Sequence, residues 1–228
     1  MFASKEYKEN LTKFQTMDGV KAVVLYGIYI LILVIQGFTY TTNLSVSVLN
    51  KLQIFFPLLF LIIGIAFVVC GKEKLCTVGV TKTNLIPSFL WGILLATCFI
   101  IGEVACFQVV GKATVTVVYP VLSTFGIFTI SAIQEEIVFR GYIQTRLTGI
   151  IKSSLACSIC TAFLFLLIHY PTRWVVSGFS WNVLGMYYVI SLLLLHFVCD
   201  LVYRRTNCLW GAIVLHFLYN MGQSMLVV

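Results

Sequence analysis

The sequence predicts an all-α, polytopic membrane protein, built as a transmembrane bundle of about seven helices. Of its 228 residues, 60% are hydrophobic and only 10% are charged, whereas soluble domains carry about 25% charged residues. The apolar residues also gather in blocks long enough to cross a bilayer as a helix, for which about 20 residues suffice. Finally, the segments between these blocks alternate between many and few Lys and Arg residues, as the loops of a multi-pass protein do.

Seven apolar blocks follow a polar beginning. Residues 1–20 are polar and include three lysines, so they indicate a tail rather than a cleavable signal peptide. The third block opens with Pro87, in the first turn, where a helix tolerates proline. The predicted spans are Ala22–Gly37, Leu52–Cys70, Pro87–Val110, a fourth that starts at Pro120, Leu155–Tyr170, Val183–Val202 and Leu209–Val228.

The chain shows no internal repeat and no separate soluble domain. We therefore divide it into a tail (1–20), an N-terminal set of spans without specific motifs (21–119) and a C-terminal region (120–228). All the motifs described below fall in the C-terminal region. The expected site therefore lies between the C-terminal four helices.

The net charge of +7 invites a nucleic-acid partner, but its distribution argues against one. From the N-terminus on, the segments between the spans hold four, one, three, one, three, one, two and no Lys or Arg residues. The positive-inside rule then places the N-terminus in the cytoplasm and the C-terminus outside. We interpret the basic excess as a topology signal and expect the lipid bilayer, not a nucleic acid, to surround the protein.

The eight cysteines give no disulfide pattern. Most of them lie inside apolar blocks, where cysteine behaves as a small hydrophobic residue. Cys157 and Cys160 form a CxxC, which could also serve redox chemistry or metal binding. Their flanking run, SSLACSICTAFLFLLIHY, is a membrane helix by composition, so packing is the favoured interpretation.

Ionisable residues inside membrane spans are candidate functional residues, because hydrocarbon penalises them by several kcal/mol. Two adjacent glutamates, Glu135 and Glu136, stand out, and Arg140 follows them. On a helix, Glu136 and Arg140 face each other at i, i+4, whereas Glu135 points about 100° away. One reading is a helix-end ion pair with a spare glutamate. The other ionisable candidates are Glu103, His169, His196, Asp200 and His216.

The register of a predicted hairpin favours a site. The basic, glycine-containing segment 149–152 looks like a cytoplasmic turn; Glu135 lies 17 residues before Lys152 and His169 lies 17 after it. In an antiparallel hairpin both would lie about 25 Å from the turn, at a rise of 1.5 Å per residue. This requires the fourth helix to continue through Leu147. A carboxylate and an imidazole at one depth are a plausible pair for activating water.

A second hairpin adds His216 and Asn220, which share a helix face at i, i+4. An imidazole N–H and an amide NH2 are the donors that an oxyanion pocket needs. His196 and Asp200 have the same spacing on the preceding span. His196 lies ten residues before position 206 and His216 ten residues after it, so His196 could also approach the site.

Other interpretations stay open at this point. Two glutamates and two or three histidines could bind zinc, although HExxH is absent. Glu103 and His196 lack a partner at motif spacing and favour a structural role. Intramembrane Glu and His also relay protons in transporters, but the inverted repeats or broken helices typical of many transporters are not recognisable.

Three ordered motifs carry a resemblance to a known family. EEIVFR (Glu135, Glu136, Arg140), FLLIH (Phe165, His169) and HFLYN (His216, Asn220) follow an EExxxR, FxxxH, HxxxN order. This set resembles the CPBP family, the CAAX proteases and bacteriocin-processing proteins, also called the Abi family. The resemblance covers about residues 120–228 and departs at no motif position.

The resemblance implies a glutamate-dependent intramembrane endopeptidase with no cofactor and no tightly bound catalytic metal. Glu135 would be the general base, with His169 holding the water; His216 and Asn220 would stabilise the oxyanion. Glu136 with Arg140 would support the site. His196 falls outside the family motifs, and the role of Asp200 stays open.

The same resemblance frames the biological expectations. Small size and the absence of extra domains suggest a bacterial plasma-membrane protein. Its peptide or membrane-protein substrates would then be pheromone or bacteriocin precursors rather than prenylated CAAX proteins. The alternative is a binding function, because family members also act as bacteriocin self-immunity proteins or as membrane partners of sensor kinases.

Overall fold

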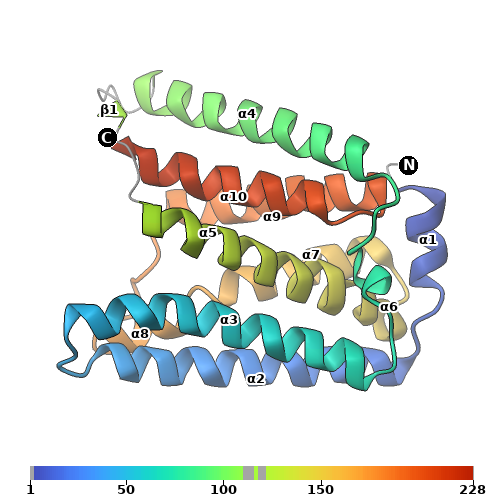
Figure 1. Cartoon of the computed structure of the whole chain (residues 1–228), viewed down its shortest axis with the longest axis horizontal. Helices are drawn as coiled ribbons and strands as arrows, with labels where there is room; N and C mark the ends of the chain where they lie inside the picture. The colour runs from blue at the N-terminus through green and yellow to red at the C-terminus, as the bar shows by residue number, and fades with distance from the viewer. Residues whose placement is uncertain (1–2, 110–115, 118–121, 228) are drawn as a thin grey trace.

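The chain folds into a bundle of long helices that lie side by side and reverse direction from one to the next (Figure 1). This computed structural model describes residues 3–109, 116–117 and 122–227. The elements are α1 (Lys5–Leu11), α2 (Thr16–Tyr40), α3 (Val46–Cys70), the 3-10 helix η1 (Leu75–Val78), α4 (Leu85–Val109), β1 (Thr116–Val117), α5 (Leu122–Glu135), the π-helix η2 (Glu136–Gln144), α6 (Thr145–Ile151), α7 (Ser154–Leu167), α8 (Pro171–Val176), α9 (Met186–Thr206), α10 (Trp210–Met225) and β2 (Leu226–Val227).

The all-α prediction is confirmed. The strands β1 and β2 are only two residues long each and pair antiparallel with each other. Five helical segments in the described residues are long and apolar enough to span a membrane: Thr16–Tyr40, Val46–Cys70, Leu85–Cys106, Ser154–Val176 and Met186–Thr206. The protein is therefore a multi-pass membrane protein, and these segments correspond to five of the seven predicted spans.

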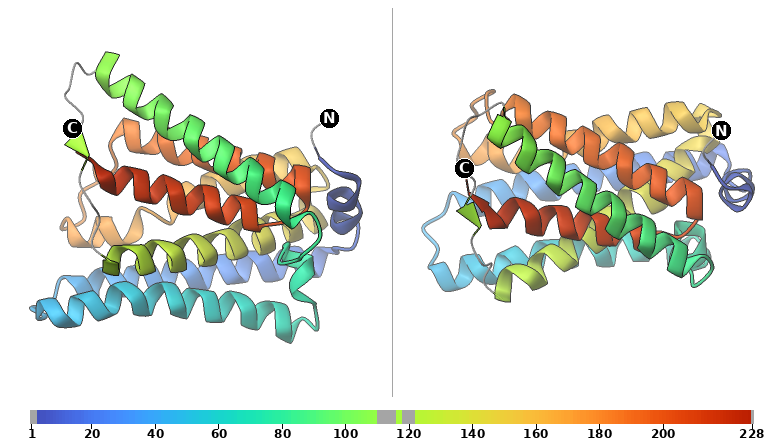
Figure 2. Two further views of the ribbon diagram at one scale, coloured as in Figure 1. Left: turned by 45° about the horizontal axis from the view of Figure 1, so that its top comes forward. Right: turned by 90° about the horizontal axis from the view of Figure 1, so that it is seen from above.

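The fourth and seventh predicted spans are also helical but differ from the other five. The fourth is the continuous segment α5–η2–α6, whose residues 136–147 are all buried although they include Glu136, Arg140 and Arg146. The seventh, α10, has only 16 residues. The η2–α6 part of the fourth segment and most of α10 are buried against other helices (Figures 1 and 2), whereas the start of α5 is open, with Phe125 50% exposed. Polar content and short length, respectively, keep them from resembling ordinary membrane spans.

Some predicted boundaries cannot be compared with the fold. Val110, Pro120 and Val228, which bounded three predicted spans, lie outside the described residues, as does the boundary at 119/120 between the two regions. The fourth helix continues beyond Leu147 to Ile151, as the hairpin register required. The turn falls at Lys152, which adopts a left-handed conformation (φ 50°), followed by Ser153 as the N-cap of α7.

The predicted polar tail is partly folded, which the sequence did not indicate. Helix α1 packs across one end of the bundle (Figure 1), and its Tyr7 is only 1% exposed. The Tyr7 hydroxyl accepts a hydrogen bond from Gln144 of η2 (3.3 Å), and the Ser4 backbone N–H donates to the carbonyl of Arg204 (2.8 Å). The first helix therefore fixes the same end of the fourth and sixth spans.

A buried arginine organises this end of the bundle. Arg146 is fully buried and pairs with Glu73, in the segment that follows α3. It also donates to the Thr77 hydroxyl and to the Gly141 carbonyl (both 2.8 Å), and its guanidinium lies 4.3 Å from the ring centroid of Phe14. One side chain thus joins three regions that are far apart in sequence, around residues 14, 73–77 and 141–146.

Helices α4 and α10 pack with their backbones in contact near the start of α10 (Figure 2). A Cβ added at Gly92 would lie 2.2 Å from the carbonyl oxygen of Gly211, and one added at Gly211 would lie 2.0 Å from that of Ser88. Close approach of this kind is typical of membrane helices with small residues at their interface. It fixes the helix that carries His216 and Asn220.

We predict that Gly92→Ala lowers the thermal stability of the purified protein, because its Cβ would meet backbone rather than a movable side chain. Overpacking of this kind typically costs about 1–3 kcal/mol. Gly102→Ala, on the same helix, is the matched control, since its Cβ meets nothing within 4 Å. Thermal unfolding in detergent measures both; equal melting temperatures for the two variants would contradict the described contact.

Candidate functional site

The two glutamates lie where the fourth helix changes type. Glu135 is the last residue of α5, and Glu136 is the first residue of the π-helix η2. π-Helical segments are rare and occur frequently at functional sites. The adjacent carboxylates point to different surroundings: Glu136 is fully buried, whereas the Glu135 side chain keeps 15% of its surface exposed. The pair therefore divides into one enclosed and one accessible carboxylate.

Glu136 forms the buried ion pair that its spacing predicted. Arg140 donates from Nη1 to Glu136 Oε1, and both side chains are fully buried. The Arg140 Nε also donates to the backbone carbonyl of His196 (3.4 Å), and its guanidinium lies 5.1 Å from the centroid of Phe165. An isolated charge at this depth would be costly, so each partner makes the burial of the other possible.

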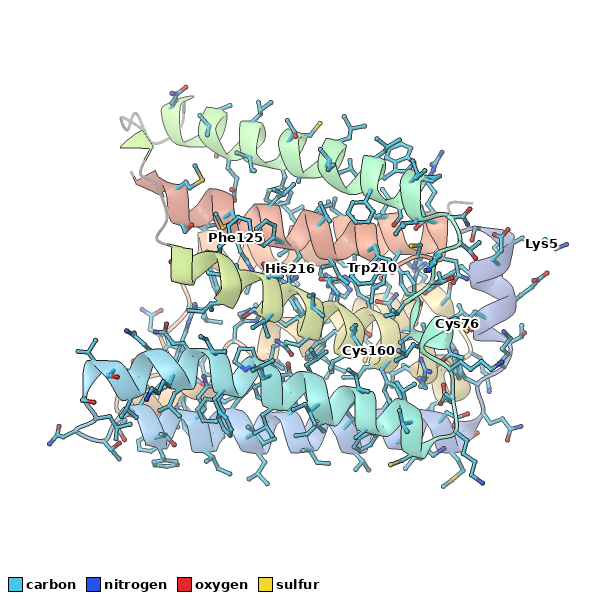
Figure 3. All side chains as sticks on the ribbon, in the orientation of Figure 1. Lys5, Cys76, Phe125, Cys160, Trp210 and His216 are labelled. Carbon is cyan, nitrogen blue, oxygen red and sulfur yellow. The ribbon has the colours of Figure 1, made fainter. Side chains whose placement is uncertain are left out.

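His216 lies between the two glutamates, in the interior of the bundle (Figure 3). Its Nδ1 is 2.8 Å from Glu136 Oε1, and its Nε2 is 3.6 Å from Glu135 Oε2. Because the Arg140-paired Glu136 is a carboxylate and can only accept, we assign the proton on Nδ1 to His216. A neutral His216 therefore turns a lone pair toward Glu135. An N–H donor at Nε2, toward the cavity, requires a second proton, which makes the ring a cationic imidazolium rather than the neutral donor.

His169, which follows α7, is protonated on the same ring nitrogen as His216, Nδ1. Its Nδ1 is 2.8 Å from the backbone carbonyl of Phe165. A carbonyl only accepts, so Nδ1 carries the proton and Nε2 has a free lone pair when the ring is neutral. Phe165 is fully buried and separates the rings, with centroid distances of 5.1 Å to His169 and 6.0 Å to His216.

The four catalytic candidates predicted from the three motifs line one cavity. It has a volume of about 430 Å³ and is lined by Glu135, His169, His216 and Asn220, among others. Binding sites for small ligands typically occupy about 300–1,000 Å³. The helices α5, α9 and α10 contribute to its boundary, together with His169, which follows the end of α7. The four candidate residues thus come from three separate parts of the sequence and face a common space.

A second cavity of about 300 Å³ lies on the other side of Glu135 and His169. These two residues, with Ile127 and Ser131, line both cavities and so form a shared wall. The second cavity extends toward α2 and α3, and Arg173 is the arginine in its lining. The hairpin register therefore brings Glu135 and His169 to one depth, where they border the same two spaces.

His196 and Asp200 lie outside this cavity. His196 is fully buried, its ring is 5.9 Å from that of Phe165, and neither ring nitrogen has a hydrogen-bond partner among the described residues. Asp200 accepts hydrogen bonds from Gln144 and Ser158 (both 2.5 Å) and pairs with Arg204. Asp200 thus joins η2, α7 and α9 away from the candidate site.

The metal interpretations gain no geometric support. Within the described residues, no group of three or more His, Cys, Asp or Glu side chains is arranged to hold a metal ion. Cys157 is buried and Cys160 is partly buried, and neither lines the cavity.

Tyr188 and Gln223 are among the residues of the cavity wall that sequence reasoning missed. Tyr188 of α9 lines it, with its ring centroid 5.9 Å from that of His169. Gln223 of α10 also lines it, and its position seven residues after His216 places it on the same helix face. The spacing could have revealed Gln223, but no motif marks Tyr188.

Fold and site together define a multi-pass membrane protein with a buried carboxylate–histidine site. Residues 117–222 match the family model of the type II CAAX prenyl endopeptidase Rce1-like proteins. This part of the chain is accordingly an Rce1-like CAAX endopeptidase domain, consistent with the CPBP family that the motifs resemble. Comparison with curated proteins and with solved structures gives no significant match.

We predict that Arg140→Met lowers the free energy of unfolding by about 3–5 kcal/mol, because it leaves Glu136 charged and buried without its partner. Adding Glu136→Gln should recover much of this loss, since the uncompensated charge disappears. Arg205→Met is the control: Arg205 is exposed and lies over the Trp91 ring, a contact worth about 1 kcal/mol or less. Unfolding in mixed micelles with increasing SDS gives the comparison. A loss for Arg140→Met no larger than for Arg205→Met would contradict this account.

Proposed function

We propose that this protein is a glutamate-type intramembrane endopeptidase in which Glu135 and His169 activate water and His216 and Asn220 stabilise the oxyanion. The observation that carries the proposal is the convergence of these four side chains on one cavity. The CAAX endopeptidase family of residues 117–222 supports peptide-bond hydrolysis as the reaction class.

In the first step, water binds at the wall between the two cavities. The free Nε2 lone pair of neutral His169 accepts one water proton as a hydrogen bond. The Glu135 carboxylate accepts the other and removes it as the water oxygen attacks the carbonyl carbon of the peptide bond. The π electrons of the carbonyl move to its oxygen, which becomes the oxyanion of a tetrahedral intermediate.

The oxyanion needs donors, and α10 supplies two. The Asn220 amide donates through its NH2 group. His216 donates through Nε2 only when it carries a second proton, because Nδ1 is engaged with Glu136. Glu135, Glu136 and Arg140 together carry one net negative charge, which a protonated His216 neutralises. In this form the imidazolium contacts both carboxylates and stabilises the developing negative charge.

Collapse of the tetrahedral intermediate releases the two products. The oxyanion restores the carbonyl, the C–N bond breaks, and the leaving nitrogen takes the proton from Glu135. Glu135 thereby returns to its carboxylate form, and His216 keeps its proton throughout. Glu136 and Arg140 exchange no proton in this scheme and hold His216 in place.

We further propose a bacterial plasma-membrane location with the N-terminus in the cytoplasm. The four segments richer in Lys and Arg lie at one end of the bundle, where α1, η1, α6 and the α9–α10 turn meet (Figure 1). The positive-inside rule makes this the cytoplasmic end. Peptides or membrane-associated proteins would be the substrates, with bacteriocin or pheromone precursors and sensor kinases as candidate partners.

We predict that Glu135→Gln, His169→Ala and His216→Ala each lower the rate of cleavage at least about a hundredfold, as expected when a general base or an oxyanion donor is lost. The control is His196→Ala, which removes a buried imidazole outside the cavity and should keep most of the activity per folded molecule. The assay uses protein in proteoliposomes, with products measured by mass spectrometry. Because residues 117–222 match a CAAX prenyl endopeptidase family, the probe is a prenylated peptide that ends in Cys-aliphatic-aliphatic-X.

The same variants at matched membrane levels in the source cell extend the test. If the three variants lose one secreted peptide that the His196 variant still releases, that peptide identifies the substrate. If every variant keeps both the products and the phenotype, catalysis is not the function. A binding role, in bacteriocin self-immunity or as a membrane partner, then takes its place.

We predict that removal of divalent metals leaves cleavage unchanged, because the scheme activates water with Glu135 and His169 alone. Activity after treatment with EDTA or 1,10-phenanthroline should stay within about twofold of the untreated protein, far from the loss of several kcal/mol of transition-state stabilisation that removal of a catalytic metal causes. Loss of activity that added zinc restores would contradict the glutamate-type mechanism.

A further inference from the structure

Glu103 is a buried carboxylate that the proposed mechanism does not use. It lies on α4, is 7% exposed and faces α9 and α10 rather than the catalytic cavity. A carboxylate inside a membrane span is expensive, so its presence calls for a role. All the motifs lie outside α4, which made this residue look isolated in the sequence.

Glu103 has two hydrogen-bond partners on α9 and one on α10, the helix that carries His216 and Asn220. Tyr187 and Ser191 of α9 donate their hydroxyls to Oε1, at 2.9 and 3.5 Å. Gln223 of α10 donates its amide to Oε2. Both carboxylate oxygens are therefore occupied, and the single bond to α10 goes to a side chain that also lines the catalytic cavity.

Gln223 is closely linked to the oxyanion donors. It follows Asn220 by three residues and His216 by seven, so all three share one face of α10. Because the cavity is bounded by this face, a small rotation of the end of α10 would move the Asn220 amide directly. Displacements of about 1 Å in catalytic groups can cost a hundredfold in rate.

Helix α4 holds α10 at its other end as well. The Ser88 hydroxyl accepts from the Gly211 backbone N–H (2.9 Å) and donates to the Cys208 carbonyl (2.8 Å). His216 and Asn220 thus lie between two fixed points, Ser88 at the start of α10 and Glu103 near its end. Ser88 holds the backbone at the start of α10, and Glu103 holds Gln223, a side chain that lines the cavity.

We propose that Glu103 is a positioning residue for peptide-bond hydrolysis, which holds α10 through Gln223 and so sets the geometry of the oxyanion donors. The inference rests on the proposed protease function. It assigns Glu103 a role through an adjacent side chain and no contact with substrate. The residue lies outside the segment that matches the endopeptidase family, so it is a feature of this chain's own N-terminal spans.

The test compares Glu103→Leu and Gln223→Leu with a conservative variant, Glu103→Gln, in proteoliposomes with the prenylated peptide. Both Leu variants should lower kcat about ten- to a hundredfold with little change in KM, because donor geometry rather than binding is disturbed. The double variant should lose no more than either single variant, since both remove one contact. Glu103→Gln should keep kcat within about threefold, because its amide still bonds to a flipped Gln223 amide.

Gly102→Ala is the control, because it changes the residue next to Glu103 on α4 and its added Cβ meets nothing within 4 Å; its kcat should stay near that of the wild type. Melting temperatures measured in parallel separate positioning from folding. A Glu103→Leu protein that loses stability but keeps its kcat would overturn the proposal. A double variant whose loss of kcat equals the product of the two single losses would also overturn it, as would a Glu103→Gln variant with a kcat as low as that of Glu103→Leu. Glu135→Gln in the same assay tests the proposed function itself: if the wild type yields no product that this variant lacks, both proposals fail.

Discussion

The buried pair of Glu136 and Arg140 is the interaction on which the rest of the site depends. It brings a charge of each sign into a bundle of otherwise apolar helices, where either alone would be strongly unfavourable. Glu136 fixes the imidazole of His216, and Arg140 contacts the ring of Phe165 and the backbone at His196. The fourth, fifth, sixth and seventh spans are thereby held around one ion pair. The accessible carboxylate of Glu135 can then face a cavity, because its neighbour already supplies the structural role.

The arrangement also explains why the fourth span is unlike the others. The part that carries Glu136, Arg140 and Arg146 is unsuited to face lipid, and other helices bury residues 136–147 completely. Its two buried arginines each pair with a carboxylate: Arg140 with Glu136 at the site, and Arg146 with Glu73 at the end of the bundle. The π-helical stretch lies between these two levels. The most polar stretch of the chain is therefore buried among the more apolar spans.

Much of the fold and part of the site followed from the sequence. Block length and hydropathy suffice for an all-α bundle, and equal spacing from Lys152 placed Glu135 and His169 at one depth. The spacing of Glu136 and Arg140 indicated their ion pair. The double contact of His216 could not be predicted, because it depends on how α10 is rotated against the fourth span. The docking of α1 depends on the burial of Tyr7, which no pattern in the polar tail marks. The π-helix left no pattern distinct from an ordinary helix, and the partner of Glu103 required knowing that α4 lies beside α10.

The shared wall of Glu135 and His169 has a consequence for what happens after the bond breaks. A chain that crosses this wall with its scissile bond at Glu135 has one part in the space toward α2 and α3 and the other in the space toward α9 and α10. Hydrolysis would leave the two fragments in separate chambers. Each fragment could then depart by its own route, in either order, and neither would block the exit of the other. Turnover in such an enzyme would be limited by the slower of two independent release steps.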